Sequence, residues 1–219
     1  MMPNRFLRCA ALFVTLLLGG CVTARVEEIR EGHTAIGAAD TIAVLGKRDR
    51  PSATETEFDF VDCVSKNMGP SVPVVPDRTF RDTLFPWFEP RTAPANTRDL
   101  PELISHPRFV ERLNNLGVKY LVWIEGSTRR TDSAGTMSCA VSPAGGGCFG
   151  FLTWENDSEY EASIWDIKEG RTVGKVSSEA VGTSYMPAII VPVPIIARVK
   201  SSACSSLADQ LTTFLTDAS

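Results

Sequence analysis

The stretch from Val118 to Gly126 reads VKYLVWIEG and carries the strongest structural signal in the chain. Its aromatic and β-branched residues favour a buried strand. Immediately before it, residues 107–116 place Phe109, Val110, Leu113 and Leu116 on one helical face, and Gly117 can end that helix. An amphipathic helix that passes directly into an apolar strand indicates an α/β domain.

The same patterns extend outward from this stretch. We expect strands at residues 41–46 and 72–76, the second at a sheet edge because of its prolines, and a hairpin formed by residues 159–166 and 172–183. Helices are expected at residues 58–67, after a cap at Asp77, after a cap at Ser105, and at residues 202–216. Together these elements predict an α/β (α+β) fold, a single mixed sheet with helices packed on its faces.

Residues 1–20 have the layout of a secretory signal. Arg5 and Arg8 precede an apolar run of about ten residues, whereas a membrane-crossing helix needs about twenty. The sequence Leu18-Gly19-Gly20-Cys21 resembles the lipobox of bacterial lipoproteins. The resemblance implies cleavage between Gly20 and Cys21 and acylation of Cys21 with palmitate-like chains, which hold a protein stably at a membrane. A transmembrane helix and an ordinary signal peptide are the alternatives.

The lipobox also bears on location and domain organisation. Val22 follows the cysteine where, by analogy with enteric bacteria, an aspartate would favour the inner membrane, so we expect the periplasmic face of the outer membrane. Residues 21–40 are expected to be a lipidated tether, and residues 41–219 a periplasmic domain with a Gly/Cys-rich insertion at 132–153. Loss of residues 1–20 would change the formal net charge from −4 to −6, since it removes two arginines and no acid. An acidic chain without clustered Lys and Arg argues against nucleic acid as a partner.

The four remaining cysteines suggest two disulfides in an oxidising periplasm. A glycine-rich turn separates Cys139 from Cys148, which makes a local bridge plausible and leaves Cys63 with Cys204. Cys63 and Cys204 lie on the apolar faces of two expected helices, so their pairing is geometrically credible. Buried free thiols remain the alternative to disulfides.

Two segments together resemble a known group of envelope proteins. Residues 116–123 contain a GV-x-YLV strand, and residues 164–173 contain W-D, an apolar residue, and then glycine, a basic residue and valine. This order resembles the amino-terminal domain of TolB and periplasmic lipoproteins of the curli-export (CsgG-like) and peptidoglycan-synthase-activator kind. The resemblance implies docking to envelope proteins without catalysis. Two features depart from it: long alternating hairpins like those of the curli exporter are not evident, and residues 132–153 are longer than a hairpin link.

Residue types that carry catalysis or bind metals are poorly arranged in this sequence. The two histidines, His33 and His106, fall in the expected tether and at a helix start, and no CxxC, HxxxH or Gly-x-Ser-x-Gly motif occurs. We therefore expect no enzyme activity, no metal and no cofactor.

Two apolar stretches are candidate interaction surfaces. Phe85, Trp87 and Phe88 lie between prolines, and residues 186–199 contain Ile189, Ile190 and Val191 within a proline-rich run. Exposed aromatic and aliphatic residues anchor interfaces, but the first stretch can equally be a plug beneath a loop and the second a buried crossover.

The leading expectation from the sequence is a non-enzymatic, outer-membrane-anchored lipoprotein that docks an envelope protein or its own copies. The alternative is a carrier that binds an apolar or cell-wall-derived ligand between the sheet and residues 186–199. An enzyme that uses the 139–148 loop is a third possibility.

Overall fold

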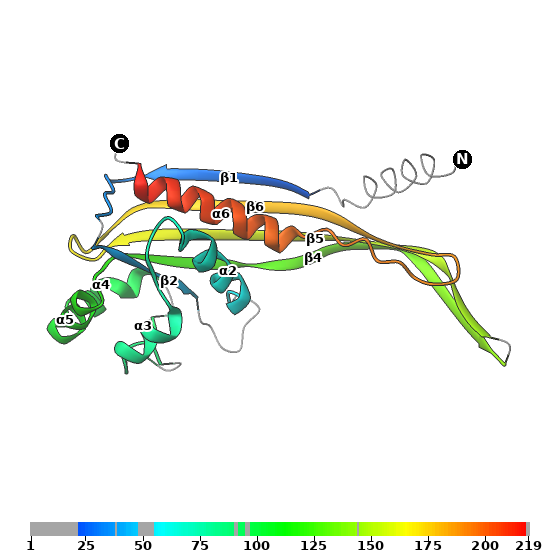
Figure 1. Ribbon diagram of the computed structural model, residues 1–219, viewed down its shortest axis with the longest axis horizontal. Coiled ribbons are helices and arrows are strands. Elements are labelled where there is room, and N and C mark those ends of the chain that lie inside the picture. The colour runs from blue at the N-terminus through cyan, green and yellow to red at the C-terminus, as the bar shows by residue number, and fades with distance from the viewer. Residues whose placement is uncertain are drawn as a thin grey trace, which may run out of the picture. The chain divides into compact units, whose positions relative to one another are not determined.

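A computed structural model describes residues 22–37, 39–47, 55–89, 92–94, 97–143 and 145–217 (Figure 1). The amino-terminal signal and Cys21 therefore lie outside the described residues. In chain order the elements are β1 (Val22–Arg30), β2 (Thr41–Gly46), α2 (Phe58–Met68), β3 (Val74–Val75), α3 (Asp77–Thr83), a 3-10 turn (Thr97–Asp99), α4 (Leu100–Ile104), α5 (Pro107–Asn115), β4 (Val118–Ser142), β5 (Gly145–Asp166), β6 (Arg171–Ala188) and α6 (Val199–Thr216).

The described chain divides into two compact units. Unit 1 holds residues 22–23, Arg129–Asp157 and Val181–Val199, and unit 2 holds Ala24–Thr128, Ser158–Ala180 and the chain from Lys200 onward. Strands β4, β5 and β6 each contribute residues to both units.

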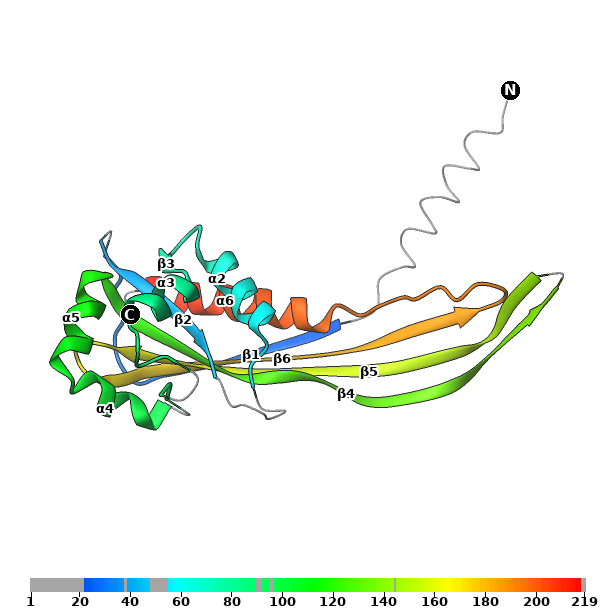
Figure 2. The same ribbon diagram turned by 90° about the horizontal axis from the view of Figure 1, so that it is seen from below.

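One sheet contains all six strands, in the order β1-β6-β5-β4-β2-β3. Strand β2 pairs in parallel with β3 and with β4, so that Ala43 lies opposite Leu121 and Leu45 opposite Trp123. Strands β4, β5 and β6 follow one another through short turns and lie side by side, which makes them an antiparallel meander (Figure 2). The sheet is therefore mixed, as expected, and β3 lies at its edge.

Helices cover both faces of the sheet in unit 2. Because side chains alternate along a strand, Leu45, Leu121 and Trp123 share a face and pack in one buried cluster with residues of α3, α4 and α5. On the other face, Phe60 of α2 stacks on Tyr160 of β5 with ring centroids 3.4 Å apart. The apolar stripes expected for helices 58–67 and 107–116 thus each fill one side of the core.

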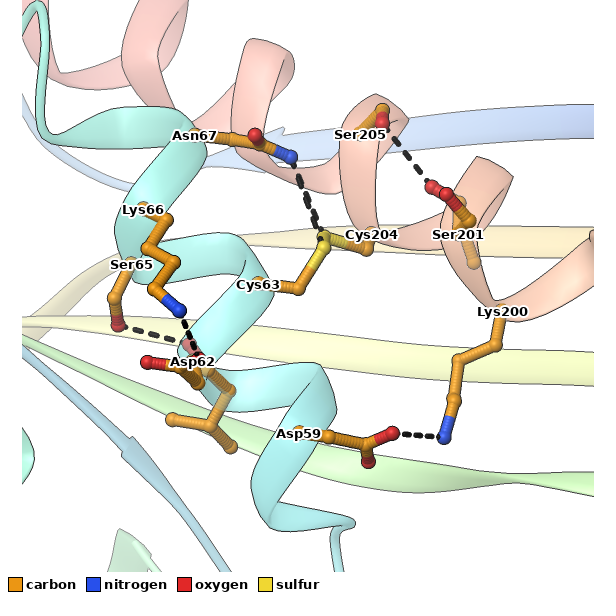
Figure 3. The surroundings of a disulfide bond; sticks show 12 residues. Asp59, Asp62, Cys63, Ser65, Lys66, Asn67, Lys200, Ser201, Cys204 and Ser205 are labelled. Atoms are coloured by element: carbon orange, nitrogen blue, oxygen red, sulfur yellow. Dashed lines mark hydrogen bonds and ion pairs between the residues drawn. A yellow bond between two sulfur atoms is a disulfide. The ribbon is translucent and has the colours of Figure 1, made fainter.

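A disulfide joins the two long helices of unit 2. Cys63 of α2 is bonded to Cys204 of α6, across 141 positions of sequence (Figure 3). The Asn67 side-chain amide lies 3.5 Å from the Cys204 sulfur, and Lys66 pairs with Asp62 on the outer face of α2 at 2.7 Å. This is the pairing that the sequence favoured, and it joins the first and the last helix of the described chain.

The segment expected to be a tether is partly a strand. Residues 22–30 form β1, which pairs with β6, and the amides of Glu31 and Gly32 just beyond it donate to the carbonyl of Val173. Arg30 holds this end of the strand, because its guanidinium lies 4.2 Å from the ring centroid of Phe214 and donates to the Phe214 carbonyl. Polar side chains make these contacts, so apolar periodicity did not reveal the strand.

Two expected helix caps are wrong in detail. Pro76 is the N-cap residue of α3, and Asp77 instead lies in the first turn, where it pairs with Arg81 at 2.9 Å. The Ser105 hydroxyl donates to the Glu102 carbonyl and closes α4, while the N-cap residue of α5 is His106. Gly117 ends that helix as expected, with a φ of 67° that favours glycine.

A buried polar cluster supports the start of α2. The Tyr160 hydroxyl donates to Glu57 at 2.8 Å, the Thr128 amide donates to the same carboxylate at 3.0 Å, and the Thr128 hydroxyl lies 2.7 Å from that of Ser158. Burial raises the pKa of the Tyr160 phenol well above its ordinary value. The phenol therefore stays protonated and serves as a donor to Glu57.

Candidate functional site

Exposed apolar side chains concentrate in unit 1. Nine of the twelve large hydrophobic residues that are exposed in the described chain belong to it, which makes this unit the candidate site. Those nine are Val141, Phe149, Phe151, Tyr185, Ile189, Ile190, Val191, Val193 and Ile196. Folded chains rarely gather so many apolar side chains on one exposed surface without a partner.

The first part of the site is the end of the β4–β5 hairpin. Residues 132–153, expected to be an insertion, continue these two strands, which are 25 and 22 residues long. The expectation that long hairpins are absent is therefore wrong: glycine and serine conceal the alternation. Gly135 and Gly150 take positive φ values of 96° and 150°, and a Cβ on either one would collide with the carbonyl of the facing strand.

A disulfide closes this hairpin end. Cys139 and Cys148 are bonded across the strand pair, the local bridge that the sequence favoured. Val141, two residues after Cys139, is 91% exposed, and Phe149, directly after Cys148, is 75% exposed. The bridge thus holds apolar side chains in place where no core covers them.

The second part of the site is the chain after β6, which turns back on itself (Figure 2). Tyr185 and Ile195 exchange backbone hydrogen bonds of 2.8 and 2.7 Å, and the Val193 amide donates to the Pro187 carbonyl at 3.0 Å. The amide of Ala197 donates to the buried hydroxyl of Ser184 at 3.0 Å. These bonds fix a loop whose apolar side chains point outward, so the buried crossover considered for residues 186–199 does not form.

The two parts meet. The Cys148 amide donates to the Ile190 carbonyl at 2.8 Å, and the rings of Phe151 and Tyr185 lie 6.1 Å apart. A shallow depression of about 420 Å³ lies between them, lined by Cys139, Cys148, Phe149, Ile189, Ile190 and their small neighbours. We refer to Val141, Phe149, Phe151, Ile189, Ile190, Val191, Val193 and Ile196 as the apolar surface.

Charged residues are excluded from the two segments that form the apolar surface. Residues 133–153 and 180–197 contain no Asp, Glu, Lys or Arg. Next to the first segment on the hairpin lies a charged band, in which Arg130 lies 5.4 Å from the Trp154 ring and Thr131 donates to Glu155 at 3.2 Å. The surface is therefore apolar, uncharged and bordered by an arginine and a tryptophan.

The two candidate surfaces named from the sequence differ in their exposure in the structure. Ile189, Ile190 and Val191 are 68–78% exposed and belong to the apolar surface. The stretch at 85–88 is instead mostly core: Phe88 is 3% exposed against Phe80, and Trp87 packs edge-on against Phe109. Phe85 is 57% exposed. The prediction of a surface residue is therefore wrong for Phe88, while Trp87 is partly buried.

Several surface residues were missed from the sequence, namely Val141, Phe149, Phe151, Val193 and Ile196. The usable signal was the absence of charge from residues 133–153 around the Phe-Gly-Phe of 149–151. Cys21 and Gly20, the expected lipidation and cleavage sites, lie outside the described residues.

A second depression lies in unit 2. It has a volume of about 590 Å³ and is lined by Phe58, Val61 and Ser65 of α2, by Pro73 and Val74 at the edge strand β3, and by charged residues that include Lys66 and Arg78. Its size would admit a small organic molecule.

Groups with displaced pKa values in unit 2 make structural contacts. The Gly37 amide and then the Lys119 ammonium, 3.0 Å away, hold the pKa of Asp40 below its ordinary value. The Asp40 carboxylate in turn raises the pKa of Lys119. Within the described residues no group of three His, Cys, Asp or Glu side chains is placed to hold a metal ion. In the same part of the chain, none of the helices combines the length and apolarity that a membrane span requires.

Comparison with known proteins gives limited information. No family model matches the chain, and no curated protein matches it. Among solved structures, a dodecamer of a PelC variant from Paraburkholderia phytofirmans is 13% identical, with a TM-score of 0.41, and the match covers 89% of this chain and 100% of that one. A second PelC dodecamer from the same organism is 12% identical, with a TM-score of 0.36 and coverages of 90% and 99%. A likeness at this level supports no conclusion about what the chain does.

Proposed function

We propose that the chain is a lipoprotein of the outer membrane, held at its periplasmic face by acylated Cys21, that acts as a non-enzymatic docking or assembly factor of the cell envelope. The observation that carries the proposal is the apolar surface of unit 1. Its side chains are fixed by a disulfide and by backbone hydrogen bonds, yet they remain uncovered. A built and exposed apolar surface is typical of an attachment site.

The position of the cysteine supports the anchoring part of the proposal. Cys21 directly precedes Val22, the first residue of β1, so no flexible linker separates the lipobox cysteine from the sheet. Acyl chains on Cys21 would hold the folded domain close to the membrane.

A relationship to the TolB amino-terminal and curli-export (CsgG-like) domains is part of the proposal. Its support is local: the GV-x-YLV motif falls in β4, which pairs in parallel with β2. The W-D motif falls at the β5–β6 turn, where the Glu169 amide donates to the Asp166 carboxylate and Gly170 has a φ of 65°. The motif residues are therefore those that build the strand and the turn.

The non-enzymatic part of the proposal draws support from the roles of the titratable groups. Tyr160, Asp40 and Lys119, whose pKa values are displaced, each donate or accept hydrogen bonds that join elements of unit 2. The displaced pKa values of these three residues are therefore explained by contacts that stabilise the fold.

Mass spectrometry of the amino-terminal peptide tests the anchoring. Trypsin should release residues 21–25 from the mature protein, since Arg25 is the first cleavage site after Cys21. We expect this peptide to begin at Cys21 and to carry diacylglycerol and an amide-linked acyl chain. The Cys21→Ala protein should lose both the modification and the cleavage. A wild-type peptide without acyl chains, or unchanged processing of Cys21→Ala, would contradict the proposal.

A carrier of an apolar or cell-wall-derived ligand is the second candidate. The observation that favours it is the depression in unit 2, whose lining includes Phe58, Val61 and Val74. Native mass spectrometry of protein released from membranes separates the two functions. A bound small molecule that is lost in Val61→Trp protein supports the carrier, whereas oligomers or protein complexes without such a molecule support docking.

A further inference from the structure

We propose that the apolar surface of unit 1 inserts into a phospholipid leaflet, the same leaflet that holds the acyl chains of Cys21. The inference rests on the proposed function, because it names the component of the envelope on which the attachment surface docks. It commits to lipid as the occupant, in place of a protein partner or a second copy of the chain.

The distribution of charge matches a lipid occupant. The surface segments, residues 133–153 and 180–197, lack charged side chains altogether. Protein interfaces usually keep a polar rim around an apolar centre, whereas hydrocarbon strongly disfavours any charge. Here charged residues stand only outside the two segments, with Asp132 and Glu155 nearest to the first, and Glu179 and Arg198 nearest to the second.

The border itself has the composition of a membrane interface. Arg130 lies 5.4 Å from the ring of Trp154, and both belong to the hairpin of unit 1. Tryptophan is enriched at the level of lipid headgroups, and arginine can extend its charge toward phosphate. The hairpin thus passes from a charged band with an aromatic residue to an uncharged apolar end.

The backbone of the loop after β6 is suited to an apolar surrounding. Pro187, Pro192 and Pro194 have no amide hydrogen to leave without an acceptor. The amides of Val193 and Ile195 donate to the carbonyls of Pro187 and Tyr185 in β6. An interfacial depth of about 5–10 Å would bury the side chains and keep the remaining backbone groups near the headgroups.

The residue that follows Cys21 in the sequence belongs to the same unit as the surface. Val22, which directly follows Cys21, is grouped with residues 129–157 and 181–199 in unit 1. A lipid on Cys21 would therefore keep the apolar surface near the leaflet.

Fluorescence quenching by brominated lipids tests the inference in the full chain. Phe149→Trp and Ile190→Trp place reporters on the apolar surface, and Phe85→Trp places a matched reporter on an exposed site of unit 2. Each lipidated protein is reconstituted in phosphatidylethanolamine and phosphatidylglycerol vesicles, with or without lipids brominated near the headgroup. The parent protein gives the background from its natural tryptophans.

We expect the fluorescence added by Phe149→Trp and by Ile190→Trp to be lost in brominated vesicles, and that added by Phe85→Trp to be retained. If all three variants retain the added fluorescence in brominated vesicles, the inference is overturned. The surface would then face water, a second copy of the chain or another protein. The mass of the 21–25 peptide from the same sample reports whether Cys21 is acylated.

A chain without acyl groups serves as the control. The Cys21→Ser forms of the same variants are mixed with excess vesicles, and the quenching is measured again. Failure of the anchor and failure of the surface are thereby distinguished.

Discussion

The backbone amide of Cys148 donates a hydrogen bond of 2.8 Å to the carbonyl of Ile190. This bond joins the disulfide-closed end of the β4–β5 hairpin to the loop that follows β6. Because each part is also fixed by its own bonds, the exposed side chains of both form one surface. The surface is therefore a built feature of unit 1, and its exposure calls for an occupant in the cell.

The Cys63–Cys204 disulfide should stabilise unit 2 strongly. It spans 141 positions, and by the loop-entropy relation its replacement in Cys63→Ala/Cys204→Ala should lower the free energy of unfolding by up to about 5 kcal/mol. The Cys139→Ala/Cys148→Ala protein, which loses a bridge over 9 positions, should lose no more than about 3 kcal/mol. Urea unfolding followed by tryptophan fluorescence compares them, and a larger loss from the shorter bridge would contradict this account.

Tyr160→Phe should destabilise the protein at neutral pH. The phenol donates to one oxygen of the Glu57 carboxylate and contacts the Thr128 hydroxyl, so its removal takes a donor from a partly buried carboxylate at a cost of about 1–3 kcal/mol. Chemical denaturation of both proteins at pH 7 measures the difference. A stability equal to that of the wild type would show that water replaces the hydroxyl without cost.

The same substitution should change the response to alkali. The folded state raises the pKa of Tyr160 above the ordinary value of 10.0, so it holds this proton more tightly than the unfolded chain does. The stability from Tyr160 is complete below pH 10 and falls above it by about 1.4 kcal/mol per pH unit. The advantage of the wild type over Tyr160→Phe should therefore shrink above pH 10, and a constant difference would contradict the burial of the phenol.

Asp40→Asn should have a small, acid-sensitive effect. Both side chains of the Asp40–Lys119 pair are about one-third exposed, so the loss at pH 7 should be below about 1 kcal/mol. Hydrogen bonding to Gly37 and the charge of Lys119 lower the pKa of Asp40. Its contribution is present above the ordinary pKa of 3.8 and lost as pH falls through the lowered value. Acid unfolding of the two proteins should converge at low pH, and divergence there would be unexpected.

Substitution of the apolar surface should separate attachment from folding. Ile189→Ser and Ile190→Ser remove side chains that are 78% and 69% exposed, so the free energy of unfolding should change by less than about 0.5 kcal/mol. Flotation with vesicles should nevertheless weaken in the Cys21→Ser chain, which depends on the surface alone. Phe109→Ala, in the core, should cost about 3–5 kcal/mol without a specific effect on flotation. Equal flotation of all forms would argue against lipid docking.

Much of unit 2 could be predicted from the sequence because its signals are local. Helix 58–67, the β5–β6 hairpin and the strand that starts at Val118 show regular apolar spacing, and the structure has each of them. Strand β1 could not be predicted this way, since Arg30 and Glu28 hold it to α6 through polar contacts. Such contacts depend on residues far away in the chain and leave no periodic pattern.

The candidate site was only partly visible in the sequence. The run at 189–191 stands out because isoleucine and valine lie among prolines. The hairpin end does not, because glycine and serine interrupt the alternation over residues 132–153. In the aromatic stretch, composition did not distinguish Phe85, which is exposed, from Phe88, which lies in the core. That distinction depends on packing against α3 and α5, which only the fold supplies.

The central claim is that the apolar surface of unit 1 attaches the chain to the membrane. Carbene footprinting of the acylated protein tests this claim most directly. Labelling is compared between the chain on phospholipid vesicles and the Cys21→Ser chain in solution. Tryptic peptides 131–168 and 176–198 cover the surface, and peptide 82–91 reports on Phe85 in unit 2. The account predicts that labelling of Phe149 and of residues 189–196 falls on vesicles while that of peptide 82–91 does not change. Equal labelling of the surface in both states would contradict it.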